Sequence, residues 1–99
     1  MRILKRATVK AYAAAHAPAT AALEVWLDKT EKARWKKPDD ILNDIRSIKV
    51  VSGERVRFEI GDNYRMVVAF DFKREIAYIK FVGTHGEYDR IDALTVDMF

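Results

Sequence analysis

The stretch FVGTHGEYDRID, residues 81–92, gathers the side chains of this chain that are best suited to chemistry. An apolar run ends at Gly83, and His85, Glu87 and Tyr88 follow around a second glycine. A histidine titrates near neutral pH, so His85 can accept or donate a proton under physiological conditions. The ring of Tyr88 can stack on a nucleobase, or its hydroxyl group can supply a hydrogen bond. The pattern therefore suggests an acid–base site where a strand ends.

Three arginines are predicted to lie close to this stretch in space. Arg55 and Arg57 alternate with apolar residues, and Arg65 follows shortly after a turn. Neighbouring ends of antiparallel strands meet, so Arg57 and Arg65 can converge with the histidine and the tyrosine on one sheet face. Guanidinium groups hold a phosphate and stabilise the negative charge that develops on it. These residue types suit metal-independent cleavage of RNA, in which the histidine moves a proton to or from the 2′-OH or the leaving oxygen.

Other kinds of site find little support in the sequence. The chain has no cysteine, and its two histidines stand too far apart to share a metal-ligand motif. P-loop, G-x-G-x-x-G and H-E-x-x-H patterns are absent, and neither Ser47 nor Ser52 has the context of a hydrolase nucleophile. We therefore expect no metal and no cofactor. The absence of cysteine makes the cytoplasm the expected location.

Three strands are predicted in the second half of the chain. Residues 55–60 (RVRFEI) alternate strictly between charged and apolar side chains, the period of a strand with one buried face. Residues 64–72 (YRMVVAFDF) become apolar on both faces, as in a central strand, and residues 76–82 (IAYIKFV) form the third strand. The polar groups GDN at 61–63 and KRE at 73–75 supply the turns between them.

Helices are predicted ahead of these strands. Apolar residues recur with helical spacing over residues 5–16 and again after Pro18, which suits the first turn of a second helix. The second helix is expected to end at Lys37, because a residue before proline is disfavoured in the helical conformation. Asp39 or Asp40 would then cap a short third helix.

The length and composition indicate one globular domain over residues 1–99. The chain is 49% hydrophobic and 33% charged and contains only four glycines and two prolines, which is typical of a folded domain. Residues 1–4 read as a short opening strand. The expected fold class is α+β, with two N-terminal helices packed on an antiparallel sheet. No segment approaches the roughly 20 apolar residues of a membrane span.

Positive charge is concentrated in the N-terminal part of the chain. Residues 1–37 carry nine Lys and Arg against three Asp and Glu, whereas residues 38–99 carry nine against twelve. A basic half beside a mildly acidic half suits a polyanionic partner such as RNA. Arg34, Lys36 and Lys37 are therefore candidate RNA contacts, although the same charges would also complement a helix C-terminus.

Each candidate also has a purely structural explanation. A histidine in a polar turn is commonly just solvated, and His16 near a helix end is expected to have no other role. Arg65 could form an ion pair with a carboxylate across the sheet, and Tyr88 could pack against the core. Trp26 and Trp35 are expected in the core rather than on an RNA-binding surface.

Three segments of the sequence resemble the HigB toxins of type II toxin–antitoxin systems, in the RelE/ParE-like superfamily. They are ARWKKPDDI at 33–41, RVRFEIGDNYRMVVAFDF at 55–72 and IKFVGTHGEYDRID at 79–92, of which the last is the most specific. The resemblance runs in order over nearly the whole chain. It implies a small RelE-like α+β domain whose sheet carries a basic RNA-binding face.

The resemblance also implies a function and partners. Toxins of this kind are typically ribosome-dependent mRNA endoribonucleases that cleave through attack of the adjacent 2′-OH. They are neutralised by a cognate antitoxin, usually a HigA-like helix-turn-helix protein encoded alongside. The expected partners are thus the antitoxin, mRNA and the ribosome, with no membrane and with DNA reached only through the antitoxin.

The resemblance assigns roles to individual residues. Arg65 matches the strand arginine that these nucleases use on the phosphate, and Tyr88 matches a tyrosine implicated in positioning the substrate. His85 follows VGT, where relatives often place an arginine or a histidine. The expected catalytic residues are therefore His85, Arg65 and Tyr88. The expected RNA-binding residues, matched only as basic positions, are Arg55, Arg57, Arg34, Lys36 and Lys37.

One departure from the family pattern leaves the chemistry open. RelE has a lysine-rich strand before its YR dipeptide, whereas Arg55, Arg57 and Glu59 stand here. A lysine base therefore cannot be assumed, which shifts weight to His85. The ParE-like branch supplies the alternative function, a non-enzymatic toxin that inhibits a protein target such as DNA gyrase. A third alternative is a plain protein-binding module without toxicity.

Overall fold

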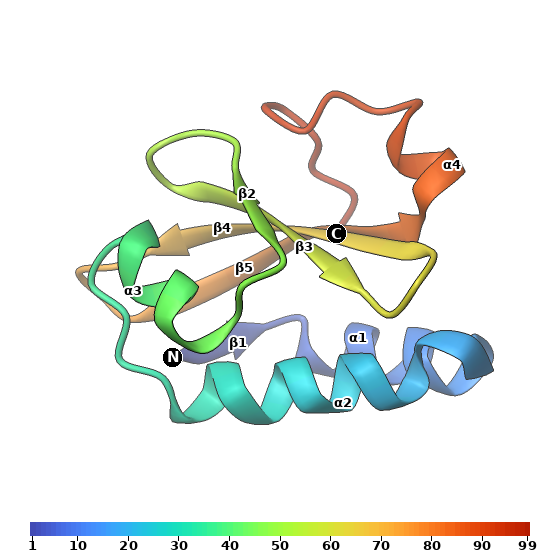
Figure 1. The fold of residues 1–99 in the computed structure, drawn as a ribbon, viewed down its shortest axis with the longest axis horizontal. Coiled ribbons are helices and arrows are strands. Elements are labelled where there is room, and N and C mark those ends of the chain that lie inside the picture. Colours follow the sequence, from blue (N-terminus) through green and yellow to red (C-terminus); the bar gives the residue numbers. More distant parts are fainter.

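The computed structural model describes residues 1–99, with a five-stranded sheet and two long helices beneath one of its faces (Figure 1). The strands are β1 (Arg2–Leu4), β2 (Ile48–Val50), β3 (Arg55–Ile60), β4 (Tyr64–Asp71) and β5 (Ile76–Thr84). The helices are α1 (Arg6–Ala15), α2 (Ala17–Lys32), α3 (Pro38–Asp44) and α4 (His85–Tyr88). None of them has the length and apolar character that crossing a membrane requires.

The predicted α+β class is confirmed, but the sheet is larger than expected and is mixed. Its strand order is β1-β5-β4-β3-β2, in which only β1 and β5 run parallel. The purely antiparallel prediction failed at β1, because α1 follows this strand at once and leaves no room for a hairpin partner. The Arg2 N–H instead donates to the Glu75 carbonyl oxygen at 2.7 Å, which starts the parallel pairing beside β5.

The core lies between the sheet and helices α1 and α2. The apolar residues of RVRFEI point to this side, as the alternation predicted, and Phe58 is completely buried. Its ring meets Trp26 edge to face at 5.4 Å and Phe70 at 6.1 Å between centroids. Burying a side chain of this kind stabilises the fold by about 1.5–3 kcal/mol. The charged residues of β3 therefore lie on the opposite face, which we call the open face of the sheet.

Helix α2 ends at Lys32, so the prediction that it continues to Lys37 was wrong. Ala33 leaves the helical conformation, and Trp35 then turns into the core, where its Nε1 donates to Asp44 Oδ2 at 2.7 Å. The amino group of Met1 also donates to the last carbonyl oxygens of α2. Burial of the indole and these bonds to the helix end outweigh the helical propensity of the basic residues.

The short third helix lies where it was predicted, but neither Asp39 nor Asp40 is its N-cap residue. It begins at Pro38, with Lys37 in the N-cap position and no side-chain capping bond. Asp40 instead accepts a hydrogen bond from the Lys36 backbone N–H at 2.8 Å, which ties the basic loop to the helix. Pro38 suits the first helical position because its missing N–H would have had no partner there.

The stretch after Gly83 is more ordered than the polar turn that the sequence suggested. Strand β5 continues to Thr84, and the one-turn helix α4 follows directly. Thr84 Oγ1 accepts from the Glu87 N–H at 3.1 Å, and Glu87 Oε1 accepts from the Thr84 N–H at 2.8 Å. This reciprocal capping box has the pattern Thr-x-x-Glu, so the sequence contained a signal for α4.

The C-terminal segment, residues 89–99, returns across the open face of the sheet (Figure 1). Arg55 holds it through Nη1, which donates to the carbonyl oxygens of Ala93 at 3.1 Å and Val96 at 2.8 Å. The Met98 N–H donates to the Lys80 carbonyl oxygen at 2.9 Å, and Lys80 Nζ pairs with Asp97 at 3.2 Å. The segment is thus attached from both β3 and β5.

Candidate functional site

Two arginines, one carboxylate and one tyrosine ring meet on the open face of the sheet. Arg57 and Arg65 place their guanidinium carbons 5.6 Å and 5.2 Å from the centroid of the Tyr88 ring. Each arginine also has one Nη2 atom 3.3 Å from the same oxygen, Oε1 of Glu59. We call these four residues the arginine cluster. It unites two of the three predicted catalytic residues and one predicted RNA-binding residue.

The cluster follows from how β3 and β4 are paired. The connection at residues 61–63 includes Gly61, whose positive φ of 58° favours glycine. The resulting register places Glu59 directly opposite Arg65, and Arg57 opposite Val67. Arg57 and Glu59 are two positions apart on one strand and therefore share a face. Sequence reasoning did not select Glu59, although it predicted the two strands and the turn whose pairing creates this contact.

The arginine cluster has an excess of positive charge. Only 17% of the Arg57 side chain and 19% of the Arg65 side chain are exposed, yet the two share a single carboxylate. The Nε atom of Arg57 is buried and has no hydrogen-bond partner. A buried donor without an acceptor is costly, and a shielded cation without a full counter-charge is more so. The geometry therefore favours binding of a further anion.

The structure also contains the ordinary explanation that the sequence offered for Arg65. Its ion pair with Glu59 crosses the sheet between directly paired residues. Tyr88, in contrast, lies outside the main core and packs on Phe81 of β5, with ring centroids 6.2 Å apart. The ion pair and the stacking together hold both guanidinium groups in place, so the structural and functional explanations are compatible.

His85 stands beside the arginine cluster in the chain but is not part of it. Its backbone N–H donates to the Asn63 carbonyl oxygen at 2.8 Å, which fixes the start of α4 at the β3–β4 turn. Half of its side chain is exposed, and Nδ1 lies 3.8 Å from Asp89 Oδ1. The imidazole is therefore accessible to solvent, and it contacts none of the four residues of the arginine cluster.

Arg55 shares the open face with the cluster but has a structural task. Its guanidinium group donates to the two carbonyl oxygens of the C-terminal segment described above. These two hydrogen bonds within the protein occupy the guanidinium group, so Arg55 is less free to bind RNA than the other predicted residues.

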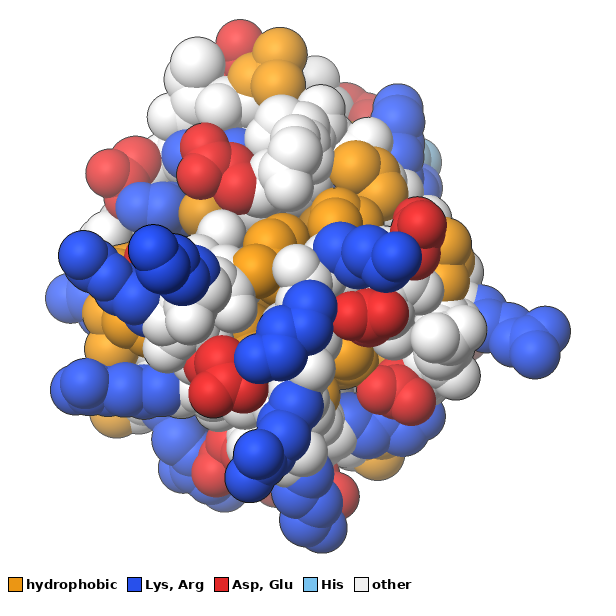
Figure 2. Space-filling view, turned by 90° about the vertical axis from the view of Figure 1, so that its left-hand side faces the viewer, with side chains coloured by type: hydrophobic (Ala, Val, Ile, Leu, Met, Phe, Trp, Pro, Cys, Tyr) orange, Lys and Arg blue, Asp and Glu red, His pale blue; other side chains and the backbone are white.

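The remaining predicted RNA contacts lie at the other end of the molecule. Arg34, Lys36 and Lys37 follow α2, and Lys36 pairs with Glu75 in the β4–β5 turn at 3.8 Å. Arg65 lies at the opposite end of β4, roughly 20 Å away at the rise of an extended strand. Figure 2 shows this end of the molecule, where many Lys and Arg side chains gather among a few carboxylates. One phosphate group cannot contact both regions.

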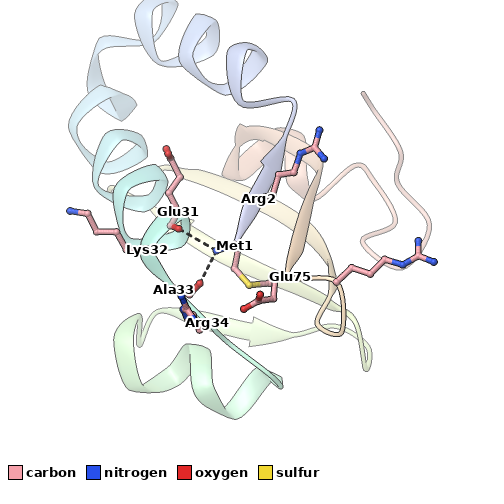
Figure 3. A pocket seen from close by; sticks show the side chains of 8 residues that line it. Met1, Arg2, Glu31, Lys32, Ala33, Arg34 and Glu75 are labelled. Atoms are coloured by element: carbon pink, nitrogen blue, oxygen red, sulfur yellow. Dashed lines mark hydrogen bonds between the residues drawn. The ribbon is translucent and has the colours of Figure 1, made fainter.

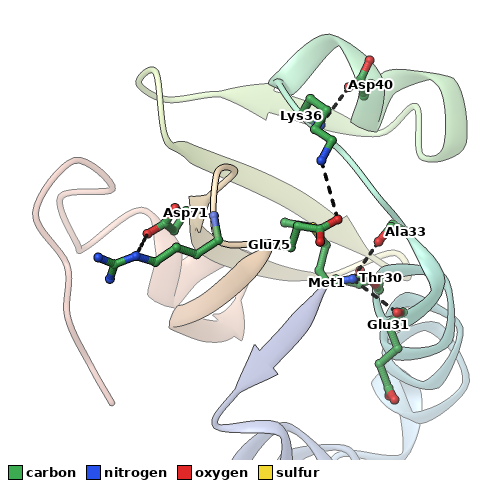
Figure 4. A network of polar contacts seen from close by, with 9 residues as sticks. Met1, Thr30, Glu31, Ala33, Lys36, Asp40, Asp71 and Glu75 are labelled. Atoms are coloured by element: carbon green, nitrogen blue, oxygen red, sulfur yellow. Dashed lines mark hydrogen bonds and ion pairs between the residues drawn. The ribbon is translucent and has the colours of Figure 1, made fainter.

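The largest surface hollow, of about 680 Å³, also lies at this basic end. It is bordered by Arg2, Lys32, Arg34 and Arg74 and by the carboxylates of Glu31 and Glu75 (Figure 3). The Met1 amino group fills its base, where it donates to the carbonyl oxygens of Thr30, Glu31 and Ala33 at 3.0, 3.3 and 2.7 Å (Figure 4). Its polar groups therefore already satisfy one another in part, whereas the arginine cluster retains unpaired donors.

A second group of polar side chains, His16, Tyr12 and Tyr64, lies near enough to α4 to influence Glu87 electrostatically. The His16 ring stacks on Tyr12 with centroids 3.8 Å apart, and both rings meet Tyr64 edge to face. Hydrogen bonds from Thr84, together with the positive field of His16, lower the pKa of Glu87. Burial raises the pKa of Tyr12 to about 12, and the charge of Glu87 adds to this effect. His16 thus has neighbours that its position at a helix end did not predict.

The structure is a small α+β domain with a cationic site on the open face of its sheet. The chain belongs to the HigB toxin family, because the family model described as HigB_toxin, RelE-like toxic component of a toxin-antitoxin system, matches residues 19–91. It is therefore the toxin of a toxin–antitoxin pair and has a cognate antitoxin as its partner. No curated protein matches the chain at a significant level. The matched residues include the whole arginine cluster and His85.

Gly83 is expected to be essential for the geometry of this site. A methyl group at Gly83 would lie 2.7 Å from Phe81 Cζ and 3.1 Å from Glu87 Oε1. Gly83→Ala should therefore displace the Phe81 ring and strain α4, which lowers the free energy of unfolding by about 1–3 kcal/mol. Gly86→Ala is the matched control, since its methyl group would meet nothing closer than 4.0 Å. Equal urea midpoints for the two variants would contradict this prediction.

Tyr12 is expected to limit stability at alkaline pH. Its pKa is raised from 10.0 to about 12 in the folded chain, so between these values only the unfolded chain loses the phenolic proton. Stability should fall as pH rises through this window and should be unaffected by Tyr12 below pH 10. Tyr12→Phe should flatten the decline and, by removing a buried unpartnered hydroxyl group, cost less than about 1 kcal/mol. Urea unfolding between pH 9 and 12 tests this, with Tyr78→Phe as the control; parallel curves for both variants would exclude the role of Tyr12.

Proposed function

We propose that this toxin is a ribosome-dependent mRNA endoribonuclease that cleaves RNA without a metal ion. The observation that carries the proposal is the arginine cluster, in which two shielded guanidinium groups share one carboxylate and one buried Nε has no acceptor. A phosphodiester supplies the missing charge, and its oxygens can accept hydrogen bonds from the exposed parts of the two guanidinium groups. Binding of its phosphate group would therefore be favoured by charge-assisted hydrogen bonds from Arg57 and Arg65.

The same contacts suit the transition state of the reaction. Attack of the 2′-oxygen on the adjacent phosphorus forms one P–O bond and breaks the bond to the 5′-oxygen, which leaves a 2′,3′-cyclic phosphate and a 5′-hydroxyl group. Negative charge increases on the non-bridging oxygens during this step. Two fixed guanidinium groups stabilise that charge without reorganising, because Glu59 and Tyr88 already hold them.

Two protons must move in this reaction, and two groups near the cluster can move them. The 2′-OH loses a proton, and Glu59 is the carboxylate that already lies against both arginines. The 5′-oxygen gains a proton, and the accessible imidazole of His85 at the rim of the site is suited to donate it. Tyr88 was predicted to position the substrate, and we propose that it does so by holding the two guanidinium groups against its ring.

The wider RNA surface is proposed to include the basic end of the molecule. Arg34, Lys36 and Lys37 are exposed there and lie too far from Arg65 to serve the same phosphate. They are suited to contact the sugar–phosphate backbone of ribosomal RNA or of the mRNA at a distance from the cleaved bond. In this proposal the protein acts in the cytoplasm, and a HigA-like helix-turn-helix antitoxin neutralises it.

Loss of either arginine should remove cleavage. In Arg57→Ala and Arg65→Ala, we expect discrete new mRNA 5′ ends after brief induction to fall by about a hundredfold or more, the effect of deleting one charge-stabilising donor. Arg46→Ala removes an exposed arginine that has no ion pair and should retain the wild-type pattern. The measurement is the mapping of RNA 5′ ends, repeated with purified protein on ribosome-bound and free mRNA.

Three results would contradict the nuclease assignment. If the folded Arg65→Ala and His85→Ala variants still arrest translation at full strength, these residues are not the catalytic site. DNA damage without new mRNA ends would favour the ParE-like alternative, a toxin that inhibits a protein target such as gyrase. If cells grow unharmed after induction of the wild-type chain, the remaining explanation is a protein-binding module without toxicity.

Glu59 should affect binding and cleavage in opposite directions. Glu59→Gln keeps the shape of the side chain but removes the charge that competes with phosphate for the arginines. We expect a 2′-deoxy oligonucleotide, which cannot be cleaved, to bind several-fold more tightly, while cleavage of RNA slows by about a hundredfold for lack of the base. Glu54→Gln, an exposed carboxylate just before the same strand, is the control. Undiminished cleavage by Glu59→Gln would show that another group accepts the proton.

A further inference from the structure

A cavity of about 420 Å³ lies beside the arginine cluster, between β5, α4 and the C-terminal segment. Phe81, Ile91, Val96 and Met98 give it apolar walls. Glu87, Arg90 and Asp97 contribute the charged part of its lining. A space of this size with apolar walls and a few polar groups is suited to a small, largely apolar ligand such as an aromatic ring.

Contacts between the sheet and the C-terminal segment hold the cavity in shape. Val67 and Val68 of β4 pair with Phe81 and Ile79, so the chain of β5 contains one extra residue, Lys80, between them. Such a bulge changes which face the following side chains occupy, and it places the Phe81 ring on the open face. Lys80 also holds the C-terminal segment, through its carbonyl oxygen to the Met98 N–H and through its ammonium group to Asp97. Arg55 holds the same segment from the other side.

The cavity neighbours the arginine cluster, to which it is linked through the packed rings of Phe81 and Tyr88. The Phe81 ring forms its inner wall and also packs on Tyr88 at 6.2 Å between centroids, and Tyr88 lies against both guanidinium groups. Arg57, Val67 and Phe81 are register partners in one row across three strands. The Cα atoms of Arg57 and Phe81 are therefore about 10 Å apart. A phosphate group at the arginines and the base of an adjoining nucleotide span a separation of this order.

We propose that this cavity binds the nucleobase of one of the two nucleotides that flank the cleaved phosphodiester. The inference rests on the proposed nuclease function and deepens it, because it adds a base subsite to the phosphate site. Val96 and Met98 offer apolar side chains against which a base packs, and Arg90 and Asp97 offer a donor and an acceptor for its edge. A ligand that fills both the cavity and the arginine cluster needs an apolar ring and a negative charge in one molecule. A nucleotide has both.

The test uses three uncleavable probes with the full-length chain. The first is a 2′-deoxy dinucleoside phosphate that carries adenine on both sugars, and in each of the other two one adenine is replaced by hydrogen. All three have the same phosphate group. NMR titration reports the two sites separately, since the Nε–H signals of Arg57 and Arg65 follow the phosphate and the amide signals of residues 90–98 follow the cavity.

The expected result is that removal of one particular base weakens binding about tenfold and abolishes the shifts of residues 90–98, while the arginine signals still respond. Val96→Trp should fill the cavity and reduce the affinity of the complete probe to that of the abasic one. Met98→Ala, which removes a wall without adding bulk, should weaken the complete probe alone. Leu94→Trp is the matched control, because Leu94 is 56% exposed in the same segment and does not line the cavity.

Other outcomes overturn the inference in distinguishable ways. If all three probes shift the arginine signals equally and leave residues 90–98 unchanged, the cavity does not bind a base but the phosphate site stands. If no probe shifts the arginine signals, the proposed function fails together with the base subsite. If only the cognate antitoxin shifts residues 90–98, the cavity belongs to the interface with that protein.

Discussion

The pairing register between β3 and β4 is the constraint on which both the core and the site depend. It sets Glu59 opposite Arg65 and keeps Arg57 on the same face, while Phe58 enters the core from the opposite face. A slip of one residue would exchange the two faces and drive the guanidinium groups into the contact with Trp26. The free energy gained by burying the core therefore also fixes the geometry of the arginine cluster.

The two positive charges of the arginine cluster lower the stability of the fold but favour binding of an anion. Two cations on a partly shielded surface repel each other, and the Tyr88 ring and the Glu59 carboxylate reduce that cost. Compensation is incomplete, since one carboxylate faces two guanidinium groups and the Arg57 Nε stays without an acceptor. The cluster therefore keeps a net positive charge on the open face of the sheet.

Helix α4 is held by the sheet that it follows. The Thr84–Glu87 capping box fixes its direction, the His85 N–H donates to the Asn63 carbonyl oxygen, and Tyr88 reaches the arginines on the open face. A one-turn helix has little stability of its own. Its order therefore comes from these contacts, which explains why the short stretch THGEYD carries so many interacting residues.

The sequence by itself determined most of the secondary structure and three of the four residues that meet in the arginine cluster, and the tertiary structure decided the partners of each residue. Alternation in RVRFEI was enough to predict which side of β3 is charged, and the hairpin and the HigB-like segments were enough to select Arg57, Arg65 and Tyr88. Composition did not reveal that Arg55 holds the C-terminal segment, that Lys36 lies at the far end beside Glu75, or that the parallel strand β1 completes the sheet. These features depend on contacts between residues remote in sequence, where burial of groups such as Trp35 overrides local preference. Local patterns encode which face a side chain occupies, but only the packed chain fixes what lies across from it.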